Sequence, residues 1–183
     1  MEILCKTILS VYKYLGAISG AIDNLVIKKS VNSSFYNNGR FSSAYDCANE
    51  IMELTDRKVN LINLKVLTED CLMELQPLER KVLSLLFLDN VKRESICEVL
   101  EISTRTFFRK RNEGIVAFEK SLCRRGYNKE KILAMFEKEK WLINLYKKNG
   151  GVIGQNSPLF YANSNDFRFI NNIMKGYVMA NAN

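Results

Sequence analysis

The chain has 183 residues, of which 47% are hydrophobic and 26% are charged, and its net charge is +7. This composition is typical of a soluble globular protein with one sizeable core. The small number of prolines (2) and glycines (9) favours long helices over a β-sandwich or barrel. Five cysteines without a CxxC pair, and no histidine at all, exclude a histidine-assisted catalytic thiol and a Cys/His zinc site. We therefore expect an all-α cytoplasmic protein with reduced, buried cysteines that is not an enzyme and holds no metal or cofactor.

The first segment, residues 1–29, has apolar residues at alternating steps of four and three, which is a coiled-coil-like stripe. An acidic residue stands at position 2, and Lys6, Lys13 and Asp23 interrupt the apolar run. An amphipathic helix therefore explains the segment better than a signal peptide or a membrane-spanning helix. The stripe consists of Leu4, Ile8, Val11, Leu15, Ile18, Ile22 and Leu25.

A second long helix is predicted from about Ala44 to Leu75, after a loop at Ser30–Ser43 that is rich in serine and asparagine. The helix carries two apolar stripes, which imply more than one packing partner. Residues 1–75 should thus form an antiparallel helical hairpin, and the sequence leaves open whether it only closes onto the rest of the chain or also makes a homodimer. One stripe contains Ala48, Met52, Val59, Ile62, Val66 and Met73, and the other contains Cys47, Ile51, Leu54 and Leu61.

Residues 76–126 are predicted to form a domain of three helices. The first helix spans Leu78–Leu88, and Pro77 suits its first turn. The second helix spans about Lys92–Leu100. The residues expected to face inward are Val82, Leu83, Leu86 and Phe87 in the first helix, and Ile96, Val99 and Leu100 in the second.

The third helix of this domain follows a tight turn at Glu101–Ile102 and starts behind Ser103, a preferred N-cap residue. It runs to about Cys123, and Gly126 ends it. Cys97 occupies the position where a helix-turn-helix needs a small side chain, so the second and third helices are predicted to form that motif. The inward residues of the third helix should be Phe107, Ile115, Phe118 and Leu122.

The third helix is rich in positive charge, with seven basic and two acidic residues between Ser103 and Arg125. A concentrated basic surface attracts phosphate, so the domain is predicted to bind double-stranded DNA. Arginine can pair with guanine, asparagine with adenine, and phenylalanine can contact a thymine methyl group. The predicted base-reading residues are Thr104, Arg105, Phe108, Arg109 and Asn112. The predicted phosphate-binding residues are Lys92, Arg93, Lys110, Arg111, Arg124 and Arg125. Ser103 is also predicted to contact the DNA.

The segment from Glu79 to Phe118, with ERKVLSLLFLD, SICEVLEIS and STRTFF, resembles region 4 of bacterial sigma factors, the domain that reads the promoter −35 element. The resemblance implies a transcription regulator, and the hairpin lacks the basic, aromatic-rich helix of sigma region 2. We therefore expect a sigma-region-4-like regulator of the phage or mobile-element type from low-GC bacteria. The segment departs from the family at Glu101, Phe108 and Arg111. The positions that read the promoter in that family correspond to Thr104, Arg105, Phe108 and Arg109.

Residues 127–148 are predicted to hold one more helix, over about Asn128–Lys147, in which Trp141 and Tyr146 are core residues instead of a base-stacking platform. Residues 149–183 are predicted to be an irregular tail with a candidate short helix at Ile170–Tyr177. The apolar residues of the helix are Ile132, Phe136, Leu142 and Leu145, and the tail residues expected to dock on the body are Phe160, Tyr161, Phe167 and Phe169.

Two alternatives to a DNA-binding regulator stay open. A small terminase-like subunit of phage DNA packaging also joins a helix-turn-helix to helical oligomerisation segments. An interaction protein that captures a sigma factor or RNA polymerase would depend on Phe108 more than on Arg105 and Arg109. RNA polymerase and a second copy of the chain, bound through the N-terminal helices, are further candidate partners, and no membrane is expected.

Overall fold

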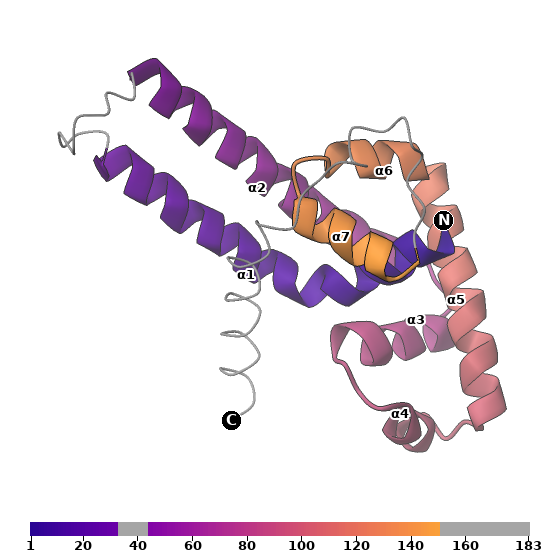
Figure 1. Cartoon of the computed structure of the whole chain (residues 1–183). Coiled ribbons are helices and arrows are strands. Elements are labelled where there is room, and N and C mark those ends of the chain that lie inside the picture. Colours follow the sequence, from indigo (N-terminus) through magenta and orange to yellow (C-terminus); the bar gives the residue numbers. More distant parts are fainter. Residues whose placement is uncertain (33–43, 151–183) are drawn as a thin grey trace.

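The computed structural model describes residues 1–32 and 44–150. Within these ranges every regular element is helical, which confirms the all-α fold class. Two long helices, α1 and α2, run side by side, and α3, α4 and α5 lie at one end of the pair (Figure 1). Most of the predicted loop at Ser30–Ser43 and nearly all of the predicted tail, including its candidate short helix, lie outside the described residues.

α1 (Glu2–Asn32) and α2 (Ala44–Met73) form the predicted antiparallel hairpin. The α1 stripe is buried from Leu4 to Ile22, and Leu25 packs against the same core. α2 faces this stripe with Leu54 and Leu61, both buried. The other predicted stripe of α2 is exposed to solvent, so only one of its two apolar faces has a packing partner in the described part of the chain.

The next predicted helix consists of α3 (Pro77–Leu83) and a π-helical turn, η1 (Ser84–Leu88). Four consecutive apolar residues form most of this turn, and the wider winding directs them to two sides. Leu85 and Leu86 pack in a small cluster around Val82, Ile96 and Phe107. Phe87 and Leu88 pack instead against the main core that contains α1. The π turn therefore joins the small cluster to the main core.

α4 (Arg93–Val99) and α5 (Thr104–Arg124) follow, at the predicted positions. The N-terminal part of α5 adds Phe107 to the small cluster, whereas its C-terminal half adds Phe118 to the main core. The prediction that Val99 faces inward is wrong, because its side chain is 71% exposed. α4 packs through the side that carries Ile96 and Leu100, and Val99 lies outside that sector of a helix with 3.6 residues per turn.

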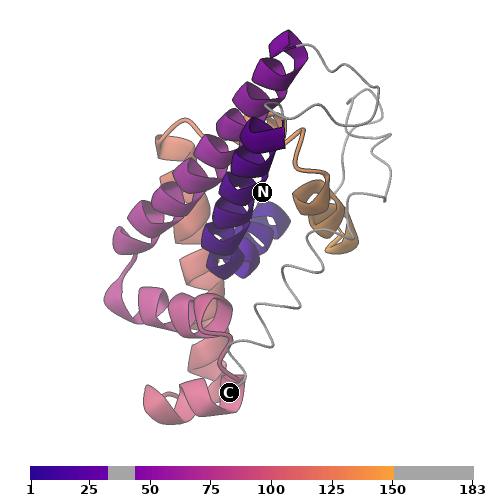
Figure 2. The same cartoon turned by 90° about the vertical axis from the view of Figure 1, so that its left-hand side faces the viewer.

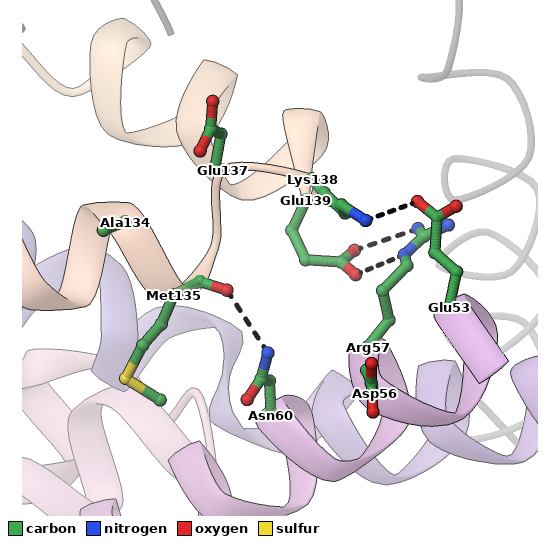
Figure 3. Close-up of a pocket in the computed structure, with 9 residues that line it drawn as sticks. All are labelled: Glu53, Asp56, Arg57, Asn60, Ala134, Met135, Glu137, Lys138 and Glu139. Carbon is green, nitrogen blue, oxygen red and sulfur yellow. Dashed lines mark hydrogen bonds and ion pairs between the residues drawn. The ribbon is translucent and has the colours of Figure 1, made fainter. Parts of the chain in front are cut away.

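The prediction of a single helix over Asn128–Lys147 is wrong, because the segment forms two helices, α6 (Lys129–Met135) and α7 (Lys140–Lys148). Between them Glu139 is buried and accepts hydrogen bonds from Arg57 Nε of α2 at 2.7 Å and from Trp141 Nε1 at 2.6 Å. Figure 3 shows the contact between Arg57 and Glu139 at the wall of a pocket between α2 and the α6–α7 connection. The helix is interrupted at this point. The break places the carboxylate of Glu139 where it accepts hydrogen bonds from both donors while buried.

The remaining predictions about the core concern α7, the cysteines and the membrane. Trp141 and Tyr146 are buried core residues, as predicted. All five cysteines are free, but only Cys5 and Cys71 are buried, while Cys123 is exposed. No helix in the described ranges has the length and apolarity that crossing a membrane requires.

Candidate nucleic-acid interface

The turn between α4 and α5 is closed by two backbone hydrogen bonds. The N–H of Ile102 donates to the carbonyl of Cys97 at 3.0 Å, and the N–H of Glu101 donates to the carbonyl of Glu98 at 3.2 Å. This pairing is a Schellman motif, which needs left-handed backbone at the residue after the C-cap. Glu101 supplies that backbone with a φ of 52°, a conformation that glycine adopts more easily. The turn is thus tight but strained at Glu101.

The first turn of α5 presents its outer side chains to solvent. Ser103 caps the helix, since its hydroxyl accepts the N–H of Thr106 at 3.2 Å, and this predicted contact residue therefore also has a structural task. Thr104 and Arg105 are exposed. Within the described ranges no carboxylate lies at ion-pair distance from Arg105, so its guanidinium is available to an anion. The positive end of the helix dipole adds to the attraction for phosphate.

Phe108 lies at the centre of a group of stacked side chains. Its ring is 38% exposed and meets Phe107 edge-on, with the two centroids 5.4 Å apart. The guanidinium of Arg93, from α4, lies 5.7 Å from the Phe108 centroid, and that of Arg111 lies 5.1 Å from it. Cation–π contacts of this kind hold both arginines at defined positions. Phe108 therefore braces two predicted phosphate-binding residues.

Two further predicted base-reading residues, Arg109 and Asn112, contact neighbours on α5. Arg109 pairs with Glu113 at 3.3 Å, one turn along the helix. Asn112 accepts hydrogen bonds from Arg111 Nε at 3.2 Å and Nη2 at 3.0 Å. Asn112 would need its carbonyl oxygen to bind adenine bidentately, so Arg111 must release it first. Both residues lie on the surface, but neither is as free as Arg105.

Lys110 lies apart from this group, on the side of α5 that packs against α3. Its Nζ binds Glu113 at 2.6 Å and Glu79 at 3.2 Å, and these hydrogen bonds raise the pKa of the lysine above its ordinary value. Glu79 itself is buried. Lys110 thus joins α5 to α3, and the sequence pattern did not reveal this contact because the two residues are far apart in the chain.

Arg124 and Arg125 lie at the opposite end of α5 from Thr104, roughly 30 Å away at 1.5 Å per residue. Arg124 binds Glu74 at 2.7 Å, and Arg125 binds Glu74 at 2.6 Å and Asp70 at 3.3 Å. These acids belong to the C-terminal end of α2 and the residues after it. Apart from Lys110, the structure therefore separates the predicted phosphate-binding cations into two groups. Lys92, Arg93 and Arg111 share the end of the motif that carries Arg105.

Gly114 allows α3 and α5 to approach closely, and sequence reasoning did not identify it. A Cβ atom at this position would lie 3.1 Å from Leu83 Cδ1 and 3.3 Å from the Cβ of Glu79. The available signal was a glycine within a predicted helix. Glycine weakens a helix by up to about 1 kcal/mol, so its presence there indicates a packing requirement that offsets this cost.

A family model described as "Protein of unknown function (DUF1492)" matches residues 47–119. The matched segment begins in α2 and ends in α5, so the similarity runs through most of α2, through α3 and α4, and through most of α5. No curated protein and no solved structure matches the chain.

Proposed function

We propose that the chain is a DNA-binding transcription regulator that places the N-terminal end of α5 in the major groove, in the manner of sigma factor region 4. The observation that carries this proposal is the distribution of charge along α5. At one end Arg105 has no ion-pair partner among the described residues, and at the other end Glu74 binds both Arg124 and Arg125. Phosphate is therefore attracted to the end with the tight turn and the capped helix.

The geometry supports distinct tasks for the residues at this end. Thr104, Arg105 and Arg109 are the best placed to reach base edges, because they are exposed on the first two turns of α5. Lys92, Arg93 and Arg111 would bind phosphates, with Phe108 holding the two arginines in position. We assign Lys110 a structural role.

The likeness to region 4 gains support from Glu101. Its positive φ is the conformation that suits the glycine common at this point of the family, so the local backbone is compatible with the resemblance. A promoter-like site and a contact with RNA polymerase are what the resemblance adds to the proposal.

Binding-site selection from random duplexes with the full chain tests the proposal, followed by affinity measurements at several salt concentrations. Arg105→Ala and Arg109→Ala should each lower the affinity for the selected site by roughly 5- to 150-fold, as expected for a lost bidentate base contact of about 1–3 kcal/mol. Lys120→Ala is the matched control, since Lys120 is exposed on the same helix but about 22 Å further along.

Equal binding of the wild type and both arginine variants to all duplexes would contradict sequence-specific reading. Capture of a sigma factor or RNA polymerase without any affinity for DNA would favour the interaction protein, and a ring of many subunits in light scattering would favour the terminase-like subunit.

A further inference from the structure

The outer face of α2 carries a row of exposed apolar residues at a constant spacing. Large apolar side chains recur every seven residues, with exposed fractions of 74%, 65%, 48%, 49% and 70%. Ile62, three residues after Val59, is 42% exposed, and Ala48 is exposed at the equivalent place two heptads earlier. The row, called the outer stripe below, consists of Tyr45, Met52, Val59, Val66 and Met73, with Ala48 and Ile62 beside it.

This spacing has a specific physical meaning. Single exposed apolar residues are normal on a protein surface, but the outer stripe spans roughly 42 Å of helix with one residue in every heptad. Two helices wind around each other through a seven-residue repeat with apolar residues at the first and fourth positions. In α2 every first position is apolar, and the fourth positions are Ala48, Thr55, Ile62 and Glu69. The N-terminal half of α2 lies at an edge of the molecule in two perpendicular views, so a second helix has access to it there (Figures 1 and 2).

We propose that the outer stripe binds the outer stripe of a second copy of this chain in a parallel two-stranded coiled coil. The charges beside the stripe argue for this partner and this direction. One edge of the stripe carries Lys58 and Lys65, which also contact Asp23 and Tyr12 of α1, and the other edge carries Asp56 and Asp70. Parallel pairing places the basic edge of one helix against the acidic edge of the other, whereas antiparallel pairing places like charges together.

In the parallel register Lys65 faces Asp70 of the partner subunit, five residues further along the heptad pattern. The carboxylate of Asp70 is half-exposed even though Arg125 contacts its Oδ2, so its other oxygen can accept a second cation. The stripe is therefore complementary to itself, as a two-fold symmetric interface must be.

Parallel pairing also places both predicted helix-turn-helix units at the same end of the dimer, because α3 begins directly after α2 and lies at its C-terminal end (Figure 1). A regulator with two such units reads two half-sites on one duplex. This last consequence depends on the proposed DNA binding, whereas the pairing of α2 does not.

The mass of the full chain in solution, measured by light scattering without DNA, tests the pairing. The wild type should be a dimer, and Val66→Glu should weaken dimerisation by roughly 100-fold or more, because each subunit would bury an unpaired carboxylate. Val116→Glu is the matched control: it makes the same change at a valine of similar exposure, 51% against 49%, but on α5. It should remain a dimer with an unchanged helix content by circular dichroism.

Oxidative cross-linking tests the direction. In a Cys123→Ser background, which removes the exposed thiol, Met73→Cys should form a covalent dimer because a parallel pair brings the two positions together. An antiparallel pair would bring position 73 close to position 45 of the other chain instead. A monomeric wild type at about 100 µM, well above a micromolar Kd, overturns the proposal, whether the stripe is then bare or covered by residues 151–183. A dimer that Val66→Glu leaves intact, or a Met73→Cys chain that does not cross-link, also overturns it.

Discussion

Replacing Glu101 with glycine should raise the free energy of unfolding, because Glu101 holds the left-handed backbone of the α4–α5 turn at a φ of 52°. A side chain in that conformation costs about 1–2 kcal/mol, which glycine avoids. Glycine also gains conformational freedom in the unfolded chain, which offsets about 0.5–1 kcal/mol of the gain. The expected net stabilisation is about 0.5–1 kcal/mol, or a rise in Tm of roughly 2 °C for a protein of this size.

Glu101→Gln separates the backbone effect from the effect of charge. It removes the same negative charge but keeps a side chain at the strained position, so its stability should match the wild type within about 0.5 kcal/mol. Urea unfolding followed by circular dichroism measures both variants, and hydrogen exchange at the N–H of Ile102 reports on the turn itself, since that group donates to Cys97. If Glu101→Gly is no more stable than Glu101→Gln, the turn is not strained at this residue.

Two further predictions concern buried groups. Glu139→Gln should lower the free energy of unfolding, measured in urea, by about 1–3 kcal/mol, because Arg57 and Trp141 lose a charged acceptor. Glu53→Gln, the control, breaks the exposed pair with Lys138 and should lower it by under about 1 kcal/mol. Equal losses in the two variants would contradict a special role of the buried carboxylate. Burial raises the pKa of Cys5 to about 12, so the protein should lose stability as the pH rises above about 9, where the thiol ionises in the unfolded chain but not in the folded one. Cys5→Ala should show a smaller loss in alkaline urea titrations, and an unchanged pH dependence would rule out this cause.

The predictions that the structure confirms rest on interactions between near neighbours in the sequence. The period of the apolar residues predicted α1 and α2 because the two helices pack against each other over many turns. Ser103 and Gly126 marked the ends of α5 because each satisfies or permits backbone geometry within a few residues.

The predictions that failed depended on contacts between distant segments. No glycine or proline marks the break between α6 and α7, and its cause is Arg57, which lies 82 residues before Glu139. Val99 is one of several apolar residues in α4, but this helix of seven residues is buried on one side only. In so short a helix the spacing of the apolar residues did not decide which of them lie on the buried side. The close approach of α3 and α5 at Gly114 has the same origin.

Acidic residues of α2, α3 and the turn between them neutralise part of the positive charge of α5. Asp70 and Glu74, near the C-terminal end of α2, bind Arg124 and Arg125 and reduce the attraction for phosphate at that end of α5. Glu79 of α3 does the same for Lys110. Without these acids a duplex would meet a basic surface along the whole helix and could bind in many orientations. The segment matched by the family model contains these three acids and the N-terminal part of α5 with Arg105, but it ends before Arg124 and Arg125.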